Sequence, residues 1–270
     1  MKKQIINFLS NLFPTAFTNF AYKQLTNPQI RKLRANEIAI LDQSKKEDFL
    51  FKGFNIKTYV WEGGEKEVLL IHGWEGQAGN FSDLIEPLLQ NGFTVRAFDG
   101  PSHGFSSSGK TSLLEFSELV GVLIRKYGVK NLISHSFGGV ATTYALYNNL
   151  DLEINKYILL TTPDRFLERI DDVVKQVGIS EKVKKSLIVR LEKENNFKVE
   201  TLNVSDFVKK IKVNESLIIH DKNDKVIPIG QSRNVHKNWK ESIFQEIEGT
   251  GHFRILRTKS VSNKVLTFLG

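Results

Sequence analysis

A serine-containing turn between an apolar run and a small-residue segment constrains the fold of this chain more than any other feature. Residues 134–139 read Ser-His-Ser-Phe-Gly-Gly, and they follow Leu132-Ile133, which we interpret as the end of a buried strand. Residues 140–146 are mostly small or apolar and predict a tightly packed helix. A serine on such a strand-to-helix turn has a strained backbone and holds its Oγ clear of the sheet edge. The segment therefore predicts an exposed hydroxyl at the end of a strand.

Small residues are required two positions before and two positions after that serine, Ser136, because strand and helix nearly touch there. Gly138, two positions after Ser136, is small as required. Ser134, two positions before it, occupies a place where such turns usually have glycine. Taken alone, the segment is also compatible with a Ser/Gly-rich loop that caps a helix. Other parts of the chain must decide between the two interpretations.

Four further segments each join an apolar strand to a loop that carries polar side chains. The predicted strands are 67–72, 94–99, 216–220 and 244–248. They lead respectively into Gly73-Trp74, the loop 100–106, the loop Asp221–Pro228 and the loop Gly249–Phe253. Alternating strands and helices impose a mostly parallel sheet, and ligands of such a sheet bind beyond the carboxyl ends of its strands. Each candidate functional residue lies at such an end.

On these ordered motifs the chain resembles the α/β-hydrolase superfamily from about Phe54 to Gly270, in the serine-esterase-like branch with a small helical cap. The resemblance implies an α/β fold with a mostly parallel eight-stranded sheet, flanking helices, a small helical cap and an N-terminal helical extension. The order Ser136, Asp224, His252 along the chain is the one that this fold uses. The resemblance also implies a reaction that needs no cofactor.

The chemistry expected at the turn needs more than the serine. A hydroxyl is a poor nucleophile at neutral pH, so Ser136 requires a base, and a carboxylate must fix the tautomer of that base. His252 is the candidate base, and Asp224 is the candidate carboxylate, in an Asp-x-x-x-Pro turn where the superfamily carries its triad acid. Asp221 lies three residues earlier and is the rival acid.

Two backbone amides are expected to meet the oxyanion that forms during acyl transfer. The first is the N–H of Phe137, which follows the candidate nucleophile. By resemblance, the second is the N–H of Trp74, just after His72-Gly73. The Trp74 side chain is expected either to line the acyl pocket or simply to pack against its neighbours.

The other five histidines have structural interpretations. His72 is expected to order the oxyanion turn by hydrogen bonding, and His103 to shape its own loop. His135, His220 and His236 are expected to be structural. No two histidines show metal-ligand spacing with a carboxylate, so no metal site is predicted.

Two segments lie outside the expected sheet. We expect residues 1–46 to form the N-terminal helical extension and residues 47–270 to form the hydrolase domain. Within that domain, about 164–214 shows apolar residues at helical spacing and is too long for a plain connection. The superfamily inserts its cap at this place.

The N-terminal extension itself has an amphipathic pattern. Lys2-Lys3 precedes apolar residues spaced along one helix face, and Pro14 is expected to begin a second helix. Packing on the domain or on a partner is one interpretation, and peripheral membrane contact is the other.

Cysteine content and charge limit the class of protein. The chain has no cysteine, which excludes disulfides and thiol catalysis and fits a reducing cytoplasm. Its formal net charge is +8, but the basic residues are scattered among acids and no arginine-rich arm is present. A lysine-rich solvated surface is therefore predicted, without a nucleic-acid partner.

These observations together predict a serine hydrolase that cleaves a small-molecule carboxylic ester or related acyl compound through an acyl-enzyme intermediate. Thioesterases, lipases and C–C-bond hydrolases use the same triad and remain alternatives. A non-catalytic binding protein with the same fold is the alternative from a different class.

Overall fold

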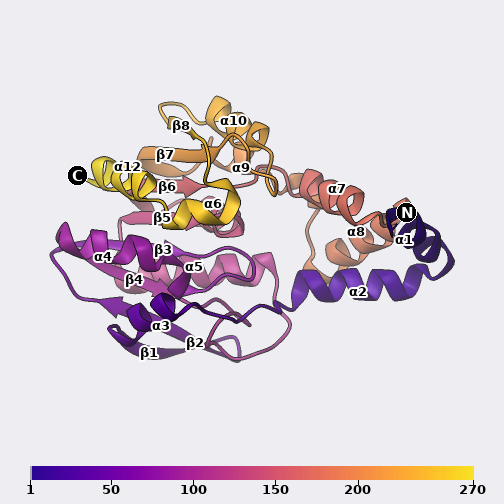
Figure 1. Cartoon of the computed structure of the whole chain (residues 1–270), viewed down its shortest axis with the longest axis horizontal. Helices are drawn as coiled ribbons and strands as arrows, with labels where there is room; N and C mark the ends of the chain where they lie inside the picture. Colours follow the sequence, from indigo (N-terminus) through magenta and orange to yellow (C-terminus); the bar gives the residue numbers. More distant parts are fainter. Residues whose placement is uncertain (1) are drawn as a thin grey trace. The chain divides into compact units, whose positions relative to one another are not determined.

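The computed structural model describes residues 2–270, which form two compact units. One unit combines the residues up to Pro28 with Arg165–Asn203, and the other combines Gln29–Asp164 with Val204–Gly270. The larger unit contains an eight-stranded sheet flanked by helices, and the smaller unit is mainly helical (Figure 1). No described helix combines the length and the apolar character that crossing a membrane requires.

The sheet of the larger unit has the mostly parallel arrangement that the sequence predicts. Its strands are β1 Lys45–Phe51, β2 Phe54–Trp61, β3 Lys66–Ile71, β4 Phe93–Phe98, β5 Asn131–His135, β6 Glu153–Leu160, β7 Lys212–Asp221 and β8 Ile243–Ile247. They lie in the order β1-β2-β4-β3-β5-β6-β7-β8. The pairs β1/β2 and β2/β4 are antiparallel, and the other neighbours are parallel.

Burial along the strands explains this arrangement. The last four residues of β3, 68–71, are all buried, as expected for a parallel strand that is covered on both faces. Strand β1 lies at the edge, and its first four residues are charged and exposed. Charged side chains on an edge strand oppose pairing with another chain.

Helices of the larger unit connect and cover the strands. They are α3 Ala35–Asp42, α4 Ser82–Gln90, α5 Leu113–Tyr127, α6 Phe137–Asn148, α9 Val204–Phe207, α10 Ile229–Asn238, α11 Gly251–Arg254 and α12 Lys259–Leu269, with 3-10 turns at Ala78–Phe81 and Ile255–Arg257. Helix α5 is capped at both ends: the Oγ of Ser112 accepts a hydrogen bond from the Glu115 N–H at 3.2 Å, and Gly128 follows in the left-handed conformation.

The smaller unit has its own apolar core. Its helices are α1 Lys2–Leu12, α2 Pro14–Thr26, α7 Phe166–Val177 and α8 Glu181–Asn195, followed by a 3-10 turn at Val199–Thr201. The core side chains come from α2, α7, α8 and that turn: Ala21, Tyr22, Ile170, Val174, Leu187, Leu191 and Val199. The first two helices thus fold together with a segment more than a hundred residues away in the chain.

The two units divide the chain differently from the domains expected at 1–46 and 47–270. Residues 29–46 belong with the sheet, because Ile40 and Leu41 of α3 are buried in its core and the Trp61 indole N–H donates to the Ile40 carbonyl at 2.8 Å. At the other boundary, the helical segment ends at Asn203.

The residues after Asn203 pack with the sheet-containing unit and not with the expected cap. Phe207 is buried, and its ring centre lies 5.2 Å from that of Tyr144 in α6. The Val204 N–H donates to the Asp164 carbonyl at 3.0 Å, so the two ends of the inserted segment meet. The insertion is therefore shorter than the predicted 164–214.

Candidate active site

Ser136 lies on a sharp turn between β5 and α6. Its backbone has φ 54° and ψ −123°, a positive φ that is rare for a residue with a side chain. The Ser136 N–H donates to the Leu160 carbonyl of β6 at 2.9 Å, and its carbonyl accepts from the Gly139 N–H at 2.9 Å. These bonds hold the strained residue in place. The strained strand-to-helix turn predicted from the sequence is present.

The residues around Ser136 show why small side chains are needed. A Cβ at Gly138 would lie 2.4 Å from the His72 carbonyl oxygen and 2.6 Å from that of Ile71. Ser134, where glycine is usual, is fully buried, and its hydroxyl donates to the Tyr157 hydroxyl at 3.0 Å. The Tyr157 hydroxyl in turn donates to the Gly139 carbonyl at 3.2 Å. Serine is tolerated at position 134 because its hydroxyl has a buried partner.

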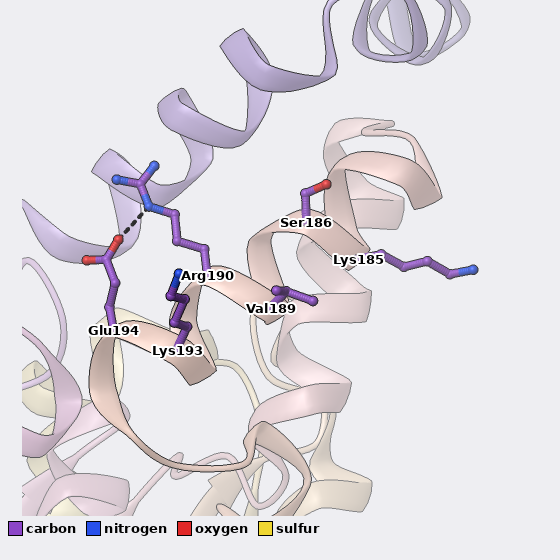
Figure 2. A pocket seen from close by; sticks show the side chains of 6 residues that line it. All are labelled: Lys185, Ser186, Val189, Arg190, Lys193 and Glu194. Carbon is purple, nitrogen blue, oxygen red and sulfur yellow. Dashed lines mark hydrogen bonds and ion pairs between the residues drawn. The ribbon is translucent and has the colours of Figure 1, made fainter.

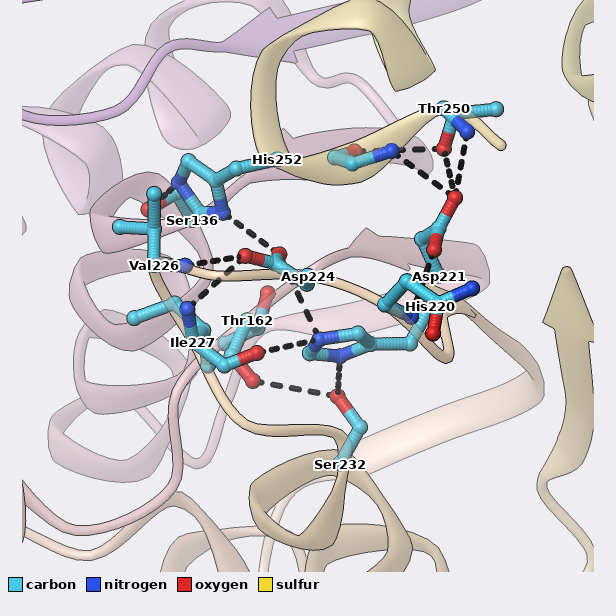
Figure 3. A network of polar contacts seen from close by, with 12 residues as sticks. Ser136, Thr162, His220, Asp221, Asp224, Val226, Ile227, Ser232, Thr250 and His252 are labelled. Carbon is cyan, nitrogen blue, oxygen red and sulfur yellow. Dashed lines mark hydrogen bonds and ion pairs between the residues drawn. The ribbon is translucent and has the colours of Figure 1, made fainter. Parts of the chain in front are cut away.

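His252 stands between Ser136 and Asp224. Its Nε2 lies 3.0 Å from the Ser136 Oγ, and its Nδ1 lies 2.8 Å from the Asp224 Oδ2 (Figure 3). Because the carboxylate can only accept, the Nδ1–H donates to Asp224 and leaves Nε2 as the acceptor for the serine hydroxyl. The structure thus brings together a serine and a histidine that lie more than a hundred positions apart in the sequence.

Asp224 is fixed as a charged carboxylate. Its Oδ1 accepts from the Val226 N–H at 2.7 Å and from the Ile227 N–H at 2.9 Å. Burial favours the neutral acid, but hydrogen bonds from His220, His252 and the Ile227 N–H outweigh it and hold the pKa of Asp224 well below its usual value.

The rival carboxylate Asp221 faces a different set of donors. Its Oδ1 accepts from the Asn223 N–H at 2.7 Å. Its Oδ2 accepts from the Thr250 N–H, from the Thr250 hydroxyl at 2.8 Å and from the Gly251 N–H at 2.8 Å. Burial raises its pKa, and these donors lower it by more. Asp221 therefore anchors the loop that carries His252, while Asp224 contacts the imidazole.

His220 lies beside Asp224, a position that the sequence did not single out. Its Nε2 is 3.0 Å from the Ile227 carbonyl and 3.5 Å from the Asp224 Oδ2, and its Nδ1 is 2.7 Å from the Ser232 Oγ (Figure 3). Since both neighbours of Nε2 are acceptors, that nitrogen carries a proton. Asp224 thus lies between two imidazoles. The only feature of the sequence that could have indicated this contact is the four-residue spacing between His220, at the end of a predicted strand, and Asp224.

His135 contacts the same loop from the other side. It is buried, and its Nε2–H donates to the His252 carbonyl at 2.9 Å. Burial lowers its pKa to about 3, with a further contribution from the nearby His252. His135 is therefore a neutral, hydrogen-bonded residue that holds the His252 backbone, in agreement with its predicted structural role.

His72 orders the turn that leads to Trp74. Its Nε2 accepts from the Gly100 N–H at 2.8 Å, so its Nδ1–H donates to the Gly73 carbonyl at 2.7 Å. Burial lowers the pKa of His72 to about 4, which keeps the ring neutral. This is the hydrogen-bonding role that the sequence predicts for His72.

The Gly73-Trp74 turn lies against the serine turn. A Cβ at Gly73 would be 3.2 Å from the Ser136 Cβ, and the ring centres of Trp74 and Phe137 are 5.3 Å apart. Within the described chain, neither the Trp74 nor the Phe137 backbone N–H donates to a protein group. The two turns that meet at Ser136 therefore each carry an amide without a protein acceptor in the described chain.

The remaining two histidines form hydrogen bonds to residues near them in the sequence. The His103 Nδ1–H donates to the Pro101 carbonyl at 2.9 Å, and burial keeps the pKa of this ring well below its usual value. His236 lies 2.8 Å from the Ser242 hydroxyl through Nδ1. Among the described residues, no group of three or more His, Asp or Glu side chains has the arrangement of a metal site.

A shallow depression on α8 does not have the features of a reaction site. It is lined by Lys185, Ser186, Val189, Arg190, Lys193 and Glu194, all from one helix of the smaller unit (Figure 2). Arg190 pairs with Glu194 at 2.7 Å and covers the Tyr22 ring. These are ordinary contacts of a solvated helix face.

Comparison with known proteins agrees with this fold. Residues 66–178 match the family described as alpha/beta hydrolase fold. The mouse (Mus musculus) serine hydrolase-like protein is 34% identical over 124 residues, which cover 42% of this chain and 38% of that protein. A human (Homo sapiens) serine hydrolase-like protein is 35% identical over 109 residues, covering 37% of this chain and 52% of that protein. The chain therefore spans about half or less of the length of these relatives.

Solved structures match over more of the chain. A putative lipase from Acinetobacter baumannii has a TM-score of 0.66 at 16% identity. The match covers 88% of this chain and 97% of the lipase chain. Est1E from Butyrivibrio proteoclasticus, solved with ferulic acid, has a TM-score of 0.65 at 19% identity. The match covers 83% of this chain and 99% of the Est1E chain. At such identities the likeness concerns the fold. Together, the sheet order, the serine turn and the match of residues 66–178 show that this chain has the α/β-hydrolase fold.

Proposed function

We propose that this chain is a serine hydrolase that cleaves carboxylic esters or related small acyl compounds. The observation that carries the proposal is the hydrogen-bonded series from the Ser136 hydroxyl through His252 to Asp224. Such a series activates a hydroxyl, because the imidazole accepts its proton while the carboxylate stabilises the resulting imidazolium.

The reaction follows from the positions of these groups. The Ser136 Oγ attacks the ester carbonyl carbon while its proton passes to the His252 Nε2, and the carbonyl electron pair moves to oxygen. Collapse of this intermediate expels the alcohol, which takes the proton from His252, and leaves an acyl group on Ser136. Water then attacks the acyl-enzyme with His252 as base, releasing the acid and restoring the serine.

The negative charge on the intermediate oxygen needs donors. The free N–H groups of Trp74 and Phe137 are suited to this role, and each such donor is worth about 2.7–4 kcal/mol in characterised hydrolases. Gly73 and Gly138, which permit the close approach of these turns, support the assignment.

Covalent labelling tests the proposal directly. A fluorophosphonate should react with Ser136 in the wild type, and Ser136→Ala should remove labelling together with roughly six orders of magnitude of ester turnover. Ser186→Ala, on the exposed face of α8, is the matched control and should leave both unchanged. Labelling at another serine, or turnover that survives Ser136→Ala, would show that the nucleophile is elsewhere. Absence of both from the wild type would favour a non-catalytic binding protein.

The acyl group is proposed to be short. Trp74 and Phe137 place aromatic surface beside the serine, and apolar contact strengthens binding by about 0.8 kcal/mol per buried methylene until the site is full. Nitrophenyl esters from acetate to hexanoate should then be cleaved faster, by kcat/KM, than laurate or palmitate. A maximum at laurate or beyond would favour the lipase alternative, and faster cleavage of matched thioesters would favour a thioesterase.

A further inference from the structure

Helix α1 exposes its apolar face to solvent. Ile5, Phe8, Leu9 and Leu12 recur at the spacing of one helix face, and all four are exposed, Phe8 by 68% and Leu12 by 58%. The only residue of the helix that is buried is Ser10. An amphipathic helix on a protein core normally shows the reverse, with its apolar stripe inside.

The contacts of α1 explain this orientation. The buried Ser10 Oγ accepts from the Ser180 N–H at 2.9 Å and donates to the Asn7 carbonyl at 2.9 Å. The Lys3 backbone lies against Gly178, where a Cβ would be 2.8 Å from the Lys3 carbonyl oxygen. The polar edge of α1 is therefore the edge that attaches to the segment between α7 and α8, and the apolar stripe remains free.

Helix α2 extends the exposed apolar surface. Phe13, which precedes α2, and Phe20 are seven residues apart and lie on one side of that helix; both are more than half exposed. We call Ile5, Phe8, Leu9, Leu12, Phe13 and Phe20 together the N-terminal apolar face. Several large exposed apolar residues within one short segment mark a surface that binds a partner or a membrane.

The charged side chains of this N-terminal segment, residues 1–28, are all of one sign. Lys2, Lys3 and Lys23 are exposed, and they are the only charged side chains in the first 28 residues. A symmetric contact between two copies would bring these cations together without an acid from this segment to pair with them. Anionic lipid headgroups complement the lysines, and the acyl region beneath complements the phenylalanines and leucines.

We propose that the N-terminal apolar face docks this protein on an anionic lipid surface, with α1 lying in the plane of the interface. Phe8, Leu12 and Phe13 enter the boundary between headgroups and acyl chains, and Lys2 and Lys3 contact the headgroups. Such helices bind reversibly, with strength set by buried apolar area and by the anionic lipid content.

Vesicle flotation with the full chain tests this docking. The protein should float with vesicles of phosphatidylcholine and phosphatidylglycerol, and much less with phosphatidylcholine alone. High salt should weaken the binding, because it screens the lysines. Flotation needs no ester turnover, so its outcome is independent of the proposed function.

Variants separate the apolar and the charged contributions. Phe8→Ser combined with Leu12→Ser should reduce partitioning by about tenfold or more. Lys2→Gln and Lys3→Gln should each reduce it by about fivefold, on anionic vesicles only. Val189→Ser, an exposed apolar residue on α8 of the same unit, is the matched control and should have no effect. Thermal melting and circular dichroism verify that each variant is folded.

Three results would overturn the proposal. The first is a failure of the wild type to float, and the second is equal binding to neutral and anionic vesicles. The third is a concentration-dependent dimer that Phe8→Ser abolishes, which would assign the N-terminal apolar face to a second copy of the chain.

Discussion

Two carboxylates at the end of β7 differ in role because different donors face them. Asp221 accepts from three groups of Thr250 and Gly251, so it fixes the loop, whereas Asp224 accepts from the His252 imidazole. The sequence places both at the end of the same strand, and spacing alone does not separate them. At the residue scale, function is assigned by the direction of single hydrogen bonds.

Substitution of the two carboxylates should therefore have unequal effects. Asp224→Asn should lower ester turnover by about 10⁴-fold, because an amide stabilises the wrong imidazole tautomer. Asp221→Asn should cost far less turnover and should instead lower the melting temperature, through its loop contacts. Steady-state kinetics and thermal melting of both variants measure this. The reverse order of turnover would make Asp221 the acid of the triad.

His220 should act through Asp224 without touching substrate. His220→Leu removes the N–H that faces the Asp224 carboxylate, and we expect kcat to fall by about tenfold with little change in KM. His220→Gln, which can still present an N–H donor, should recover most of the loss. If both variants lose activity equally and also melt earlier, the role of His220 is only structural.

At the scale of elements, the turn between β5 and α6 depends on a close approach that leaves no room for a side chain at Gly138. Gly138 faces two backbone carbonyls of the neighbouring strand end, which cannot move aside as a flexible side chain would. Gly230, in α10, has open space where a Cβ would stand, with no neighbouring atom within 4 Å, and thus provides a contrast within the same unit.

Adding one methyl group at each glycine should give opposite results. Gly138→Ala should destabilise the protein by about 1–3 kcal/mol or more and should sharply reduce turnover, because the serine turn must shift. Gly230→Ala should be neutral or stabilising by up to about 1 kcal/mol, since alanine favours the helix. Urea unfolding and ester kinetics provide the readout. Normal activity in Gly138→Ala would mean that the backbone of the turn can move away from the two carbonyl groups without disturbing Ser136.

At the scale of the whole molecule, the chain crosses between two units, and the larger one contains every residue proposed for catalysis. The Val204 N–H donates to the Asp164 carbonyl at 3.0 Å, so the ends of the inserted segment can be joined by a short linker. The N-terminal helices share their core with that segment, and both must be removed together.

Removing both parts of the smaller unit should leave a folded protein. A variant without residues 1–28 and with 165–203 replaced by a short linker should unfold cooperatively and label on Ser136, with altered substrate preference. A larger deletion, 164–214, should not fold, since it removes the buried Val204 and Phe207 and the start of β7. Circular dichroism and labelling compare the two. Failure of the smaller deletion would mean that the sheet-containing unit depends on the helical one.

Buried histidines should make the stability of the whole chain depend on pH. In the folded protein the pKa of His72 is lowered to about 4 and that of His135 to about 3, whereas the unfolded chain protonates near pH 6.5. Below that pH the unfolded state binds protons that the folded state does not, so stability is lost as pH falls. Each histidine should contribute a slope of about 1.4 kcal/mol per pH unit.

Urea unfolding between pH 7 and pH 5 measures this effect. Over this range most carboxylates remain ionised, so the three buried histidines with lowered pKa values, His72, His103 and His135, dominate the change. His135→Gln, whose amide can still donate to the His252 carbonyl, should flatten the slope by the contribution of one proton. An unfolding free energy that stays constant across the range would contradict the prediction.

The sequence by itself determined the sheet, the order of the motifs and the place of the serine turn. Apolar runs of strand length, a Gly-containing turn at Ser136 and loops at the ends of later strands are local patterns, and each depends on neighbouring residues only. Ser136, Asp224 and His252 were therefore identifiable as candidates before the structure placed them within hydrogen-bond distance.

Only the tertiary structure decided which distant segments share a core and which donors face each buried acid. The first two helices join α7 and α8 because Ala21 and Tyr22 bury there, and apolar periodicity does not identify the partner of a helix. For the same reason the exposure of the apolar face of α1, and the contact between His220 and Asp224, were not evident from the sequence. Periodicity records that a face is apolar, whereas packing determines what, if anything, covers it.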